Sequence, residues 1–138
     1  TIPEERMKAR REHRIPLSKR AVEVLRAAEQ LRPSPQPHEL VFTSVRGRRI
    51  DASVVSKMIA RLGIDAVPHG FRSSFRDWAS ERTDHPREVV EAALAHTVRD
   101  QTEAAYARSD LFERRRHLMD DWAEYLKAPR GQVVTLRR

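Results

Sequence analysis

The sequence predicts an α+β fold that is mostly helical, with a small antiparallel β-sheet near the N-terminus. Two observations lead to this prediction. Several segments space their apolar residues as amphipathic helices do, and residues 1–17 contain two short extended segments around a turn. A chain of 138 residues suits a single domain. Its 4 Gly against 8 Pro exclude collagen-like and glycine-linker classes.

The sheet is expected within residues 1–17. Thr1-Ile2-Pro3 is typical of a strand end, and residues 14–17 are its expected return partner, which Pro16 limits to a sheet edge or strand end. Residues 6–14 between them carry five cations and one anion. They are expected to form a basic hairpin tip.

Two helices are expected next. Ser18 is a suitable N-cap for a helix whose apolar residues recur every three or four positions, and a proline-rich loop follows it. Residues 46–49 indicate a basic turn. Asp51 or Ser53 can cap the second helix, which Gly63 ends.

A third helix follows Pro68. Phe71, Phe75 and Trp78 fall on one stripe of this helix, which we expect to lie in the core. At about 100° per residue, the opposite side carries polar and basic residues. They are His69, Arg72, Ser73 and Arg76.

Two further helices complete the predicted domain. Pro86 stands near the first position of one of them. Asp110 and Glu113 resemble a capping pair for the other, which continues to about residue 127. We therefore expect one domain over residues 1–127 and an irregular C-terminal tail over residues 128–138.

The net charge indicates a polyanionic partner. The chain has 27 Lys+Arg and 20 Asp+Glu, a formal net charge of +7 and a pI of about 10.7. Because such a domain attracts polyanions, nucleic acid is the first partner to consider. No apolar run approaches about 18 residues, so we expect no membrane span.

Several classes of reactive site are excluded. The absence of Cys rules out disulfides, thiolate zinc sites, iron–sulfur clusters and cysteine nucleophiles. The isolated glycines form no phosphate loop, the histidines lack zinc-protease spacing, and no carboxylate cluster suits two magnesium ions. We therefore expect no metal and no cofactor. Chemistry on a phosphate would then depend on cations and hydrogen-bond donors.

Five residues are candidates for such chemistry: Lys8, His69, Arg72, His96 and Tyr106. Taken singly, each has an ordinary structural explanation. Taken together, their order and spacing resemble the catalytic domain of the tyrosine recombinases, the phage-type integrases, and most closely the prophage and genomic-island branch. The motifs are His69-Gly70-Phe71-Arg72, Leu94-Ala95-His96 and Ala104-Ala105-Tyr106.

The N-terminal segment supports the same resemblance. Residues 7–18 resemble the hairpin that carries the family's catalytic lysine. Lys8 is chosen because it stands eight residues before Pro16, as the family's lysine usually does before its corresponding proline. The likeness runs from residue 1 to about residue 127.

The resemblance implies a role for each candidate residue. Tyr106 attacks a scissile phosphodiester and forms a 3′-phosphotyrosyl link. Arg72 binds two oxygens of the phosphorane, while His69 and His96 donate hydrogen bonds or help to take the tyrosine proton. Lys8 is the general acid for the leaving 5′ oxygen. The implied function is site-specific DNA integration and excision.

The resemblance also implies partners. We expect double-stranded DNA attachment sites, a homo-tetramer on DNA held by the C-terminal tail, and a cytoplasmic, nucleoid-associated protein of bacterial or phage origin. The apolar residues 133–136 are suited to adding a strand to a neighbouring protomer. The basic residues expected to hold phosphates are Arg10, Arg11, Arg46, Arg48, Arg49 and Arg76.

One family residue has no counterpart in this sequence. The family carries a further catalytic arginine on a helix upstream of the hairpin, and Arg6 lies on the wrong element to replace it. Since the chain also lacks an initiator Met, we expect an N-terminally truncated fragment that is inactive alone. The alternatives are a non-catalytic basic DNA- or RNA-binding module, a type IB topoisomerase, and a degraded prophage product that folds without activity.

Overall fold

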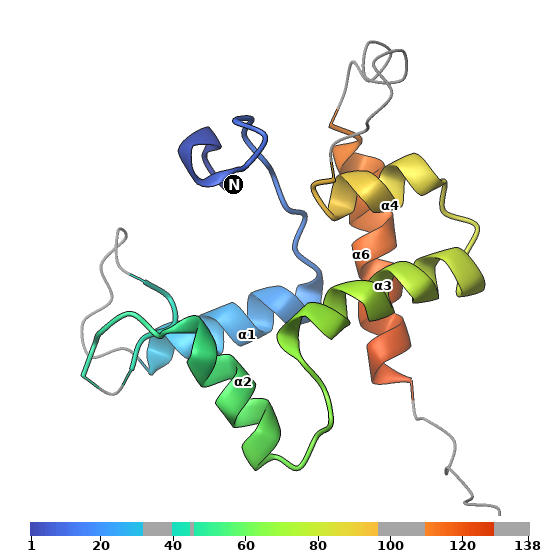
Figure 1. Cartoon of the computed structure of the whole chain (residues 1–138). Coiled ribbons are helices and arrows are strands. Elements are labelled where there is room, and N and C mark those ends of the chain that lie inside the picture. Colours follow the sequence, from blue (N-terminus) through green and yellow to red (C-terminus); the bar gives the residue numbers. More distant parts are fainter. Residues whose placement is uncertain (32–39, 45, 97–109, 129–138) are drawn as a thin grey trace, which may run out of the picture.

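A computed structural model describes residues 1–31, 40–44, 46–96 and 110–128. Over these residues the protein is mostly helical, which confirms that part of the predicted fold class (Figure 1). A short 3-10 helix, η1, precedes the α-helices. The elements are η1 (Glu4–Arg6), α1 (Lys19–Gln30), α2 (Ala52–Arg61), α3 (Pro68–Arg82), α4 (Arg87–Ala93) and α6 (Phe112–Lys127).

The predicted antiparallel sheet is not confirmed. In place of strands, the described residues form two isolated antiparallel bridges: Ile2 with His13, and Thr43 with Arg49. Two backbone hydrogen bonds of 2.8 and 2.9 Å join the first of these pairs. The pairing stops there because Pro3 has no amide hydrogen to donate and Glu4 already begins η1.

Side-chain caps begin α1 and α2, as the sequence predicts. Ser18 Oγ accepts a hydrogen bond from the backbone N–H of Ala21 at 3.3 Å. Asp51 Oδ1 accepts one from the backbone N–H of Ser53 at 2.8 Å, so Asp51 is the cap of α2. Gly63 follows α2 with a φ of +69°, a left-handed conformation that glycine adopts without steric cost.

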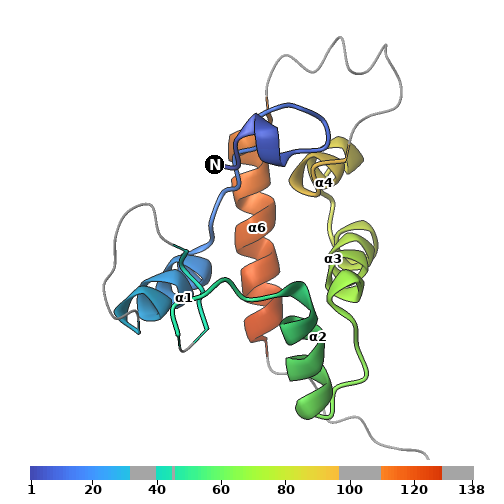
Figure 2. The same ribbon diagram turned by 60° about the vertical axis from the view of Figure 1, so that its left-hand side comes forward.

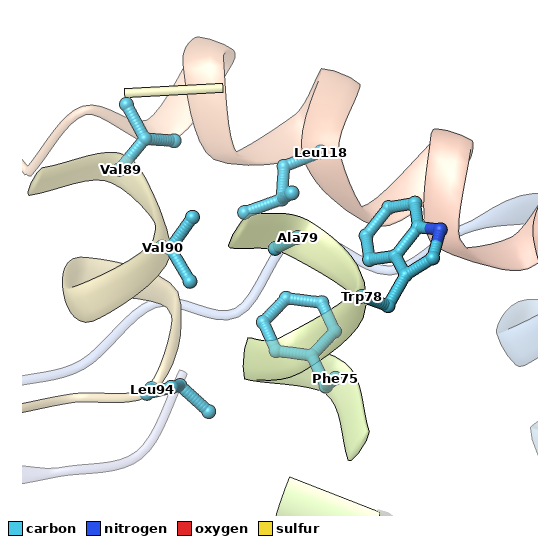
Figure 3. Close-up of a cluster of buried hydrophobic side chains, with 7 residues drawn as sticks. All are labelled: Phe75, Trp78, Ala79, Val89, Val90, Leu94 and Leu118. Carbon is cyan, nitrogen blue, oxygen red and sulfur yellow. The ribbon is translucent and has the colours of Figure 1, made fainter. Parts of the chain in front are cut away.

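The hydrophobic core lies between α3, α4 and α6 (Figure 3). α4 packs against both of the other helices. Each of α3, α4 and α6 contributes one fully buried apolar side chain, and these are Ala79, Val89 and Leu118 respectively. Because burying a side chain of the size of valine or leucine contributes about 1.5–3 kcal/mol, this cluster holds the three helices in place. The remaining buried members are Phe75, Trp78, Val90 and Leu94.

One apolar residue predicted to be buried is exposed, and so is most of the apolar side of α2. The expected core position of Phe71 is wrong: this side chain is 56% exposed, because the core meets α3 only from Phe75 onward. Ile59 is the one large apolar side chain that the described part of α2 buries, whereas Val55 and Met58 are exposed. Figures 1 and 2 show α1 and α2 at the end of the molecule away from α4.

Candidate functional site

The polar face of α3 is formed as the sequence predicts. Because α3 is one continuous helix, side chains three, four or seven residues apart share a side of it. His69, Arg72 and Arg76 lie along that side, and all three are exposed. The buried aromatic residues of the core fix the rotation of α3 about its axis (Figure 3).

Arg72 reaches the C-terminal end of α4. Its Nη2 donates a hydrogen bond to the backbone carbonyl of Leu94, the residue that caps α4. Leu94 stands two residues before His96. The contact therefore places the guanidinium group of Arg72 beside the segment that carries His96.

A left-handed turn ends α4 and redirects the chain at His96. The backbone N–H of Ala95 donates to the carbonyl of Ala92 at 3.1 Å, and that of His96 donates to the carbonyl of Glu91 at 3.0 Å. Ala95 has a φ of +52°, as the residue after a helix end of this kind requires. The turn brings His96 back toward the last turn of α4.

Glu91 connects His96 to α3. Its Oε2 lies 2.5 Å from Nδ1 of His96. Its Oε1 lies 2.9 Å from both Nε and Nη2 of Arg76. The side chain of Glu91 is only 17% exposed, against 50% for Arg76 and 41% for His96. The largely buried carboxylate of Glu91 therefore links two more exposed side chains, the guanidinium group of Arg76 and the imidazole of His96.

The hydrogen bonds of Glu91 keep its carboxyl group ionised. Burial has the largest single effect on it and raises its pKa. The hydrogen bonds from His96 and Arg76 act in the other direction and together outweigh burial, so the pKa of Glu91 falls below its ordinary value. An ionised carboxylate only accepts hydrogen bonds, so the nitrogens facing it are donors.

The other predicted catalytic residues lie apart from this network. His69 is exposed one turn before Arg72 on α3. Lys8 is exposed in a turn closed by the hydrogen bond from Arg10 N–H to the carbonyl of Met7, at 3.1 Å. No hydrogen bond or ion pair joins Lys8 to the described parts of α3 and α4. Tyr106 lies outside the described residues.

Asp110 joins the base of this N-terminal turn to the start of α6. Its Oδ2 accepts a hydrogen bond from Arg14 Nε at 2.8 Å and lies 3.4 Å from Arg115 Nη2. Arg115 Nη1 also donates to the backbone carbonyl of Arg14 at 2.7 Å. Sequence reasoning missed this cluster. The available signal was a charged residue, Arg115, on the apolar stripe that contains Leu118.

The basic segment at residues 46–49 forms a tight turn. The backbone N–H of Gly47 donates to the carbonyl of Ser44 at 2.8 Å, and Gly47 has a φ of +70°. Five of the arginines predicted to bind phosphate are exposed, with no ion pair to any described residue. They are Arg10, Arg11, Arg46, Arg48 and Arg49.

The site on α3 and α4 is suited to an oxyanion. A guanidinium group offers N–H donors in a planar fork, and an imidazole adds a further donor or acceptor nitrogen. Within the described residues, no group of three or more His, Asp or Glu side chains is placed to hold a metal ion. No helix in the described part of the chain is both long and apolar enough to cross a membrane.

Comparison with known proteins identifies relatives over almost the whole chain. A family profile described as "Phage integrase family" matches residues 1–112. The chain is 36% identical to Prophage integrase IntA of Escherichia coli strain K12, over 98% of this chain and 33% of that protein. It is 30% identical to Prophage integrase IntZ of the same strain, over 90% of this chain and 31% of that protein.

A phage protein is similar over the same region. The chain is 29% identical to the integrase of Enterobacteria phage P4, over 94% of this chain and 30% of that protein. The chain thus spans about a third of the length of the curated relatives it matches. No solved structure matches it significantly.

Proposed function

This chain belongs to the phage integrase family, and we propose that it takes part in site-specific DNA recombination by metal-free phosphoryl transfer. The observation that carries the proposal is the contact between Arg72 and the carbonyl of Leu94. It gathers a guanidinium group and the imidazole-bearing segment at one exposed place. Two motifs that resemble catalytic motifs of the family, with Arg72 and Leu94 22 residues apart, are in contact there, which supports the proposal.

We propose Tyr106 as the nucleophile. Its phenolic oxygen forms a bond to the scissile phosphorus, and the bond from phosphorus to the 5′ oxygen breaks. The phenolic proton passes to a base, and the leaving oxygen takes up a proton from an acid. The 5′ hydroxyl of the partner strand then attacks the 3′-phosphotyrosyl link, which restores a phosphodiester and frees the tyrosine. The ester conserves the bond energy, so no nucleotide cofactor is needed.

Arg72 is the proposed binder of the phosphorane, because its planar fork can hold two oxygens at once. His69 and His96 complete the oxyanion site with hydrogen bonds, and one of them accepts the tyrosine proton. Lys8 is the proposed general acid. Its position in an exposed turn, with no described ion-pair partner, leaves the ammonium group available to reach DNA.

DNA binding outside the reacting phosphate is assigned to the arginines of the two basic turns. Arg10 and Arg11 lie in one turn, and the three arginines at 46, 48 and 49 lie in the other. Phosphate contacts of this kind position the duplex, and they weaken steeply with salt. Arg76 differs from this group because its guanidinium group already pairs with Glu91.

A covalent trapping assay tests the nucleophile. The longest natural gene product that contains this chain is incubated with nicked suicide DNA, and the covalent adduct is measured. We expect an adduct with the wild-type protein and none with Tyr106→Phe, which should still bind DNA. An adduct on another tyrosine would contradict the assignment. DNA binding without any wild-type adduct would favour a non-catalytic binding module.

A second variant tests the phosphate-binding fork. Arg72→Lys keeps one positive charge but cannot hold two oxygens in a planar arrangement. We expect adduct formation to fall by about 10²–10³-fold, as removal of one oxyanion donor typically produces. A rate close to wild type would show that a point charge is enough there.

Strand exchange between two attachment sites, as opposed to relaxation of supercoils alone, separates a recombinase from a type IB topoisomerase.

The homo-tetramer stays a proposal. Its predicted determinant, the tail over residues 128–138, lies outside the described residues except at residue 128. We expect a chain cut after Lys127 to bind DNA as a lower oligomer than the uncut protein. Equal assembly of the two in size-exclusion chromatography with DNA would exclude a role for the tail.

A further inference from the structure

Glu91 uses its two carboxylate oxygens for two different partners. One oxygen faces Nδ1 of His96 at 2.5 Å, and the other receives both facing nitrogens of Arg76 at 2.9 Å. Each oxygen therefore has a partner within the protein, and the side chain of Glu91 is only 17% exposed. A carboxylate held from both sides in this way has a fixed orientation, which it can impose on the ring of His96.

The contact determines which nitrogen of His96 carries the proton. An ionised carboxylate cannot donate, so Nδ1 must be the donor in this pair. In the neutral ring, Nε2 then carries no proton. Nε2 lies on the far edge of the ring from Glu91, and the ring is 41% exposed. A fixed tautomer thus leaves a defined nitrogen for a ligand.

We propose that Glu91 is a positioning residue for His96, which orients the imidazole through Nδ1 and presents the unprotonated Nε2 of the neutral ring to the hydroxyl of the attacking tyrosine. The proposal deepens the proposed function and rests on it. Glu91 itself touches no substrate in this scheme. A carboxylate that orients a histidine in this way is a common arrangement in sites that depend on one particular ring nitrogen.

Arg76 belongs to the same hydrogen-bonded arrangement as Glu91 and His96. It lies one helical turn after Arg72 on α3, and both side chains reach the last turn of α4. Arg72 contacts the backbone at Leu94, whereas Arg76 holds the carboxylate of Glu91. Arg76 therefore acts on His96 indirectly, through Glu91, and its guanidinium group is already paired with a carboxylate of α4.

The tautomer of His96 is measurable on this chain without DNA. Long-range ¹H–¹⁵N correlation spectra of the labelled chain distinguish a protonated Nδ1 from a protonated Nε2. At a pH where the ring is neutral, we expect Nδ1–H in the wild type and a shift toward Nε2–H in Glu91→Leu. Glu91→Gln keeps an acceptor oxygen and should retain most of the Nδ1–H form. Glu88→Gln, an exposed position on the same helix, is the control and should leave the tautomer unchanged.

The covalent trapping assay gives a second readout. Glu91→Leu should slow adduct formation by about 10–100-fold, the usual effect of removing a group that orients a reactive residue, and Glu91→Gln should slow it less. If Glu91 acts through His96, the double variant Glu91→Leu/His96→Ala should be no slower than His96→Ala alone. An additional loss in the double variant would mean that Glu91 acts independently of His96.

Two results would overturn the proposal. One is a wild-type spectrum with Nε2–H as the neutral form, and the other is a Glu91→Leu spectrum identical to wild type. The spectra report the tautomer of His96 independently of DNA cleavage. A wild-type protein that forms no adduct contradicts the proposed function, while the tautomer still decides whether Glu91 orients His96.

Discussion

Arg115 on α6 donates a hydrogen bond from Nη1 to the backbone carbonyl of Arg14, 101 residues away in the sequence, at 2.7 Å. The Arg115 side chain is only 1% exposed, and burial lowers its pKa. Asp110 lies beside it and offsets part of this cost. The bond therefore ties the N-terminal segment to the core helices through one buried cation.

Replacement of this cation should loosen the N-terminal segment. Arg115→Met keeps the aliphatic stem but leaves the Arg14 carbonyl without its charged donor, so we expect a loss of roughly 1–3 kcal/mol in the free energy of unfolding. The buried Arg115 Nε has no hydrogen-bond partner among the described residues, which favours the lower end of that range. Urea denaturation measures the loss. Arg114→Met, at a 55% exposed side chain, is the control and should change stability by less than about 0.5 kcal/mol.

The three-helix core predicts a large effect at Leu118. This side chain is fully buried where α6 meets α3 and α4 (Figure 3). Leu118→Ala should lower the free energy of unfolding by about 2–5 kcal/mol, because it removes buried methyl groups and leaves a cavity. Leu126→Ala on the same helix, where the side chain is 51% exposed, should cost much less. Equal losses at the two positions would contradict the assigned core.

The cap of α1 is a separate, local contribution. Ser18 Oγ accepts the Ala21 N–H, and Ser18 itself is 8% exposed. Ser18→Ala should destabilise the protein by about 1 kcal/mol, and Ser18→Asp, which also caps, should restore most of that loss. Thermal unfolding followed by circular dichroism compares the three proteins. A Ser18→Asp variant no better than Ser18→Ala would show that the hydroxyl acts in some other way.

The helices were predictable because their signals are local. Ser18, Asp51 and Gly63 mark helix ends through bonds or backbone angles that involve only neighbouring residues. The sheet and the exposure of Phe71 were not, because they depend on which segments meet across the fold. A stripe of apolar residues predicts a helix but does not state how many of its turns reach a core.

The candidate site likewise contains residues that local sequence motifs point to and residues that only the three-dimensional arrangement reveals. His69, Arg72 and His96 stand in motifs that predict one group of site residues; the structure places Arg72 beside the segment of His96, and the rest of the grouping stays a prediction. Glu91 lies in an apolar run of α4, where nothing local distinguishes its carboxylate from that of Glu88. Its role emerges only when α3 brings Arg76 alongside α4. Similarly, Arg115 looks like one member of a basic run until its buried position is known.

The contribution of the ionised Glu91 carboxylate to stability should depend on pH. Burial raises the pKa of this carboxyl, but the hydrogen bonds from His96 and Arg76 together have a larger, opposite effect. The pKa therefore lies below the ordinary value of 4.5. A group with a lowered folded-state pKa stabilises the fold fully above its unfolded-state value and loses that contribution as pH falls through the folded-state value. The stability advantage of wild type over Glu91→Gln should therefore be largest near neutral pH and shrink on acidification below 4.5. Urea denaturation over a pH series measures it, and Glu88→Gln should show no comparable change.

The proposed role of Lys8 has a distinctive chemical signature. An alkoxide is a poor leaving group, so the 5′ oxygen must gain a proton as its bond to phosphorus breaks. Lys8→Ala should therefore slow cleavage of ordinary DNA by roughly 10²–10³-fold. A 5′-bridging phosphorothiolate substrate leaves as a thiolate, which needs no proton because a thiol has a pKa of only about 8.5. Lys8→Ala should cleave that substrate at close to the wild-type rate.

A neighbouring cation of the same turn supplies the comparison for Lys8. Arg11→Ala removes an equal charge from an exposed position and should weaken DNA binding, with the same deficit on both substrates because it donates no proton to the leaving oxygen. The ratio of the two cleavage rates, measured at saturating protein, isolates proton donation from binding. If Lys8→Ala remains slow on the phosphorothiolate, or if Arg11→Ala is rescued equally, Lys8 acts as a phosphate contact and another group protonates the 5′ oxygen.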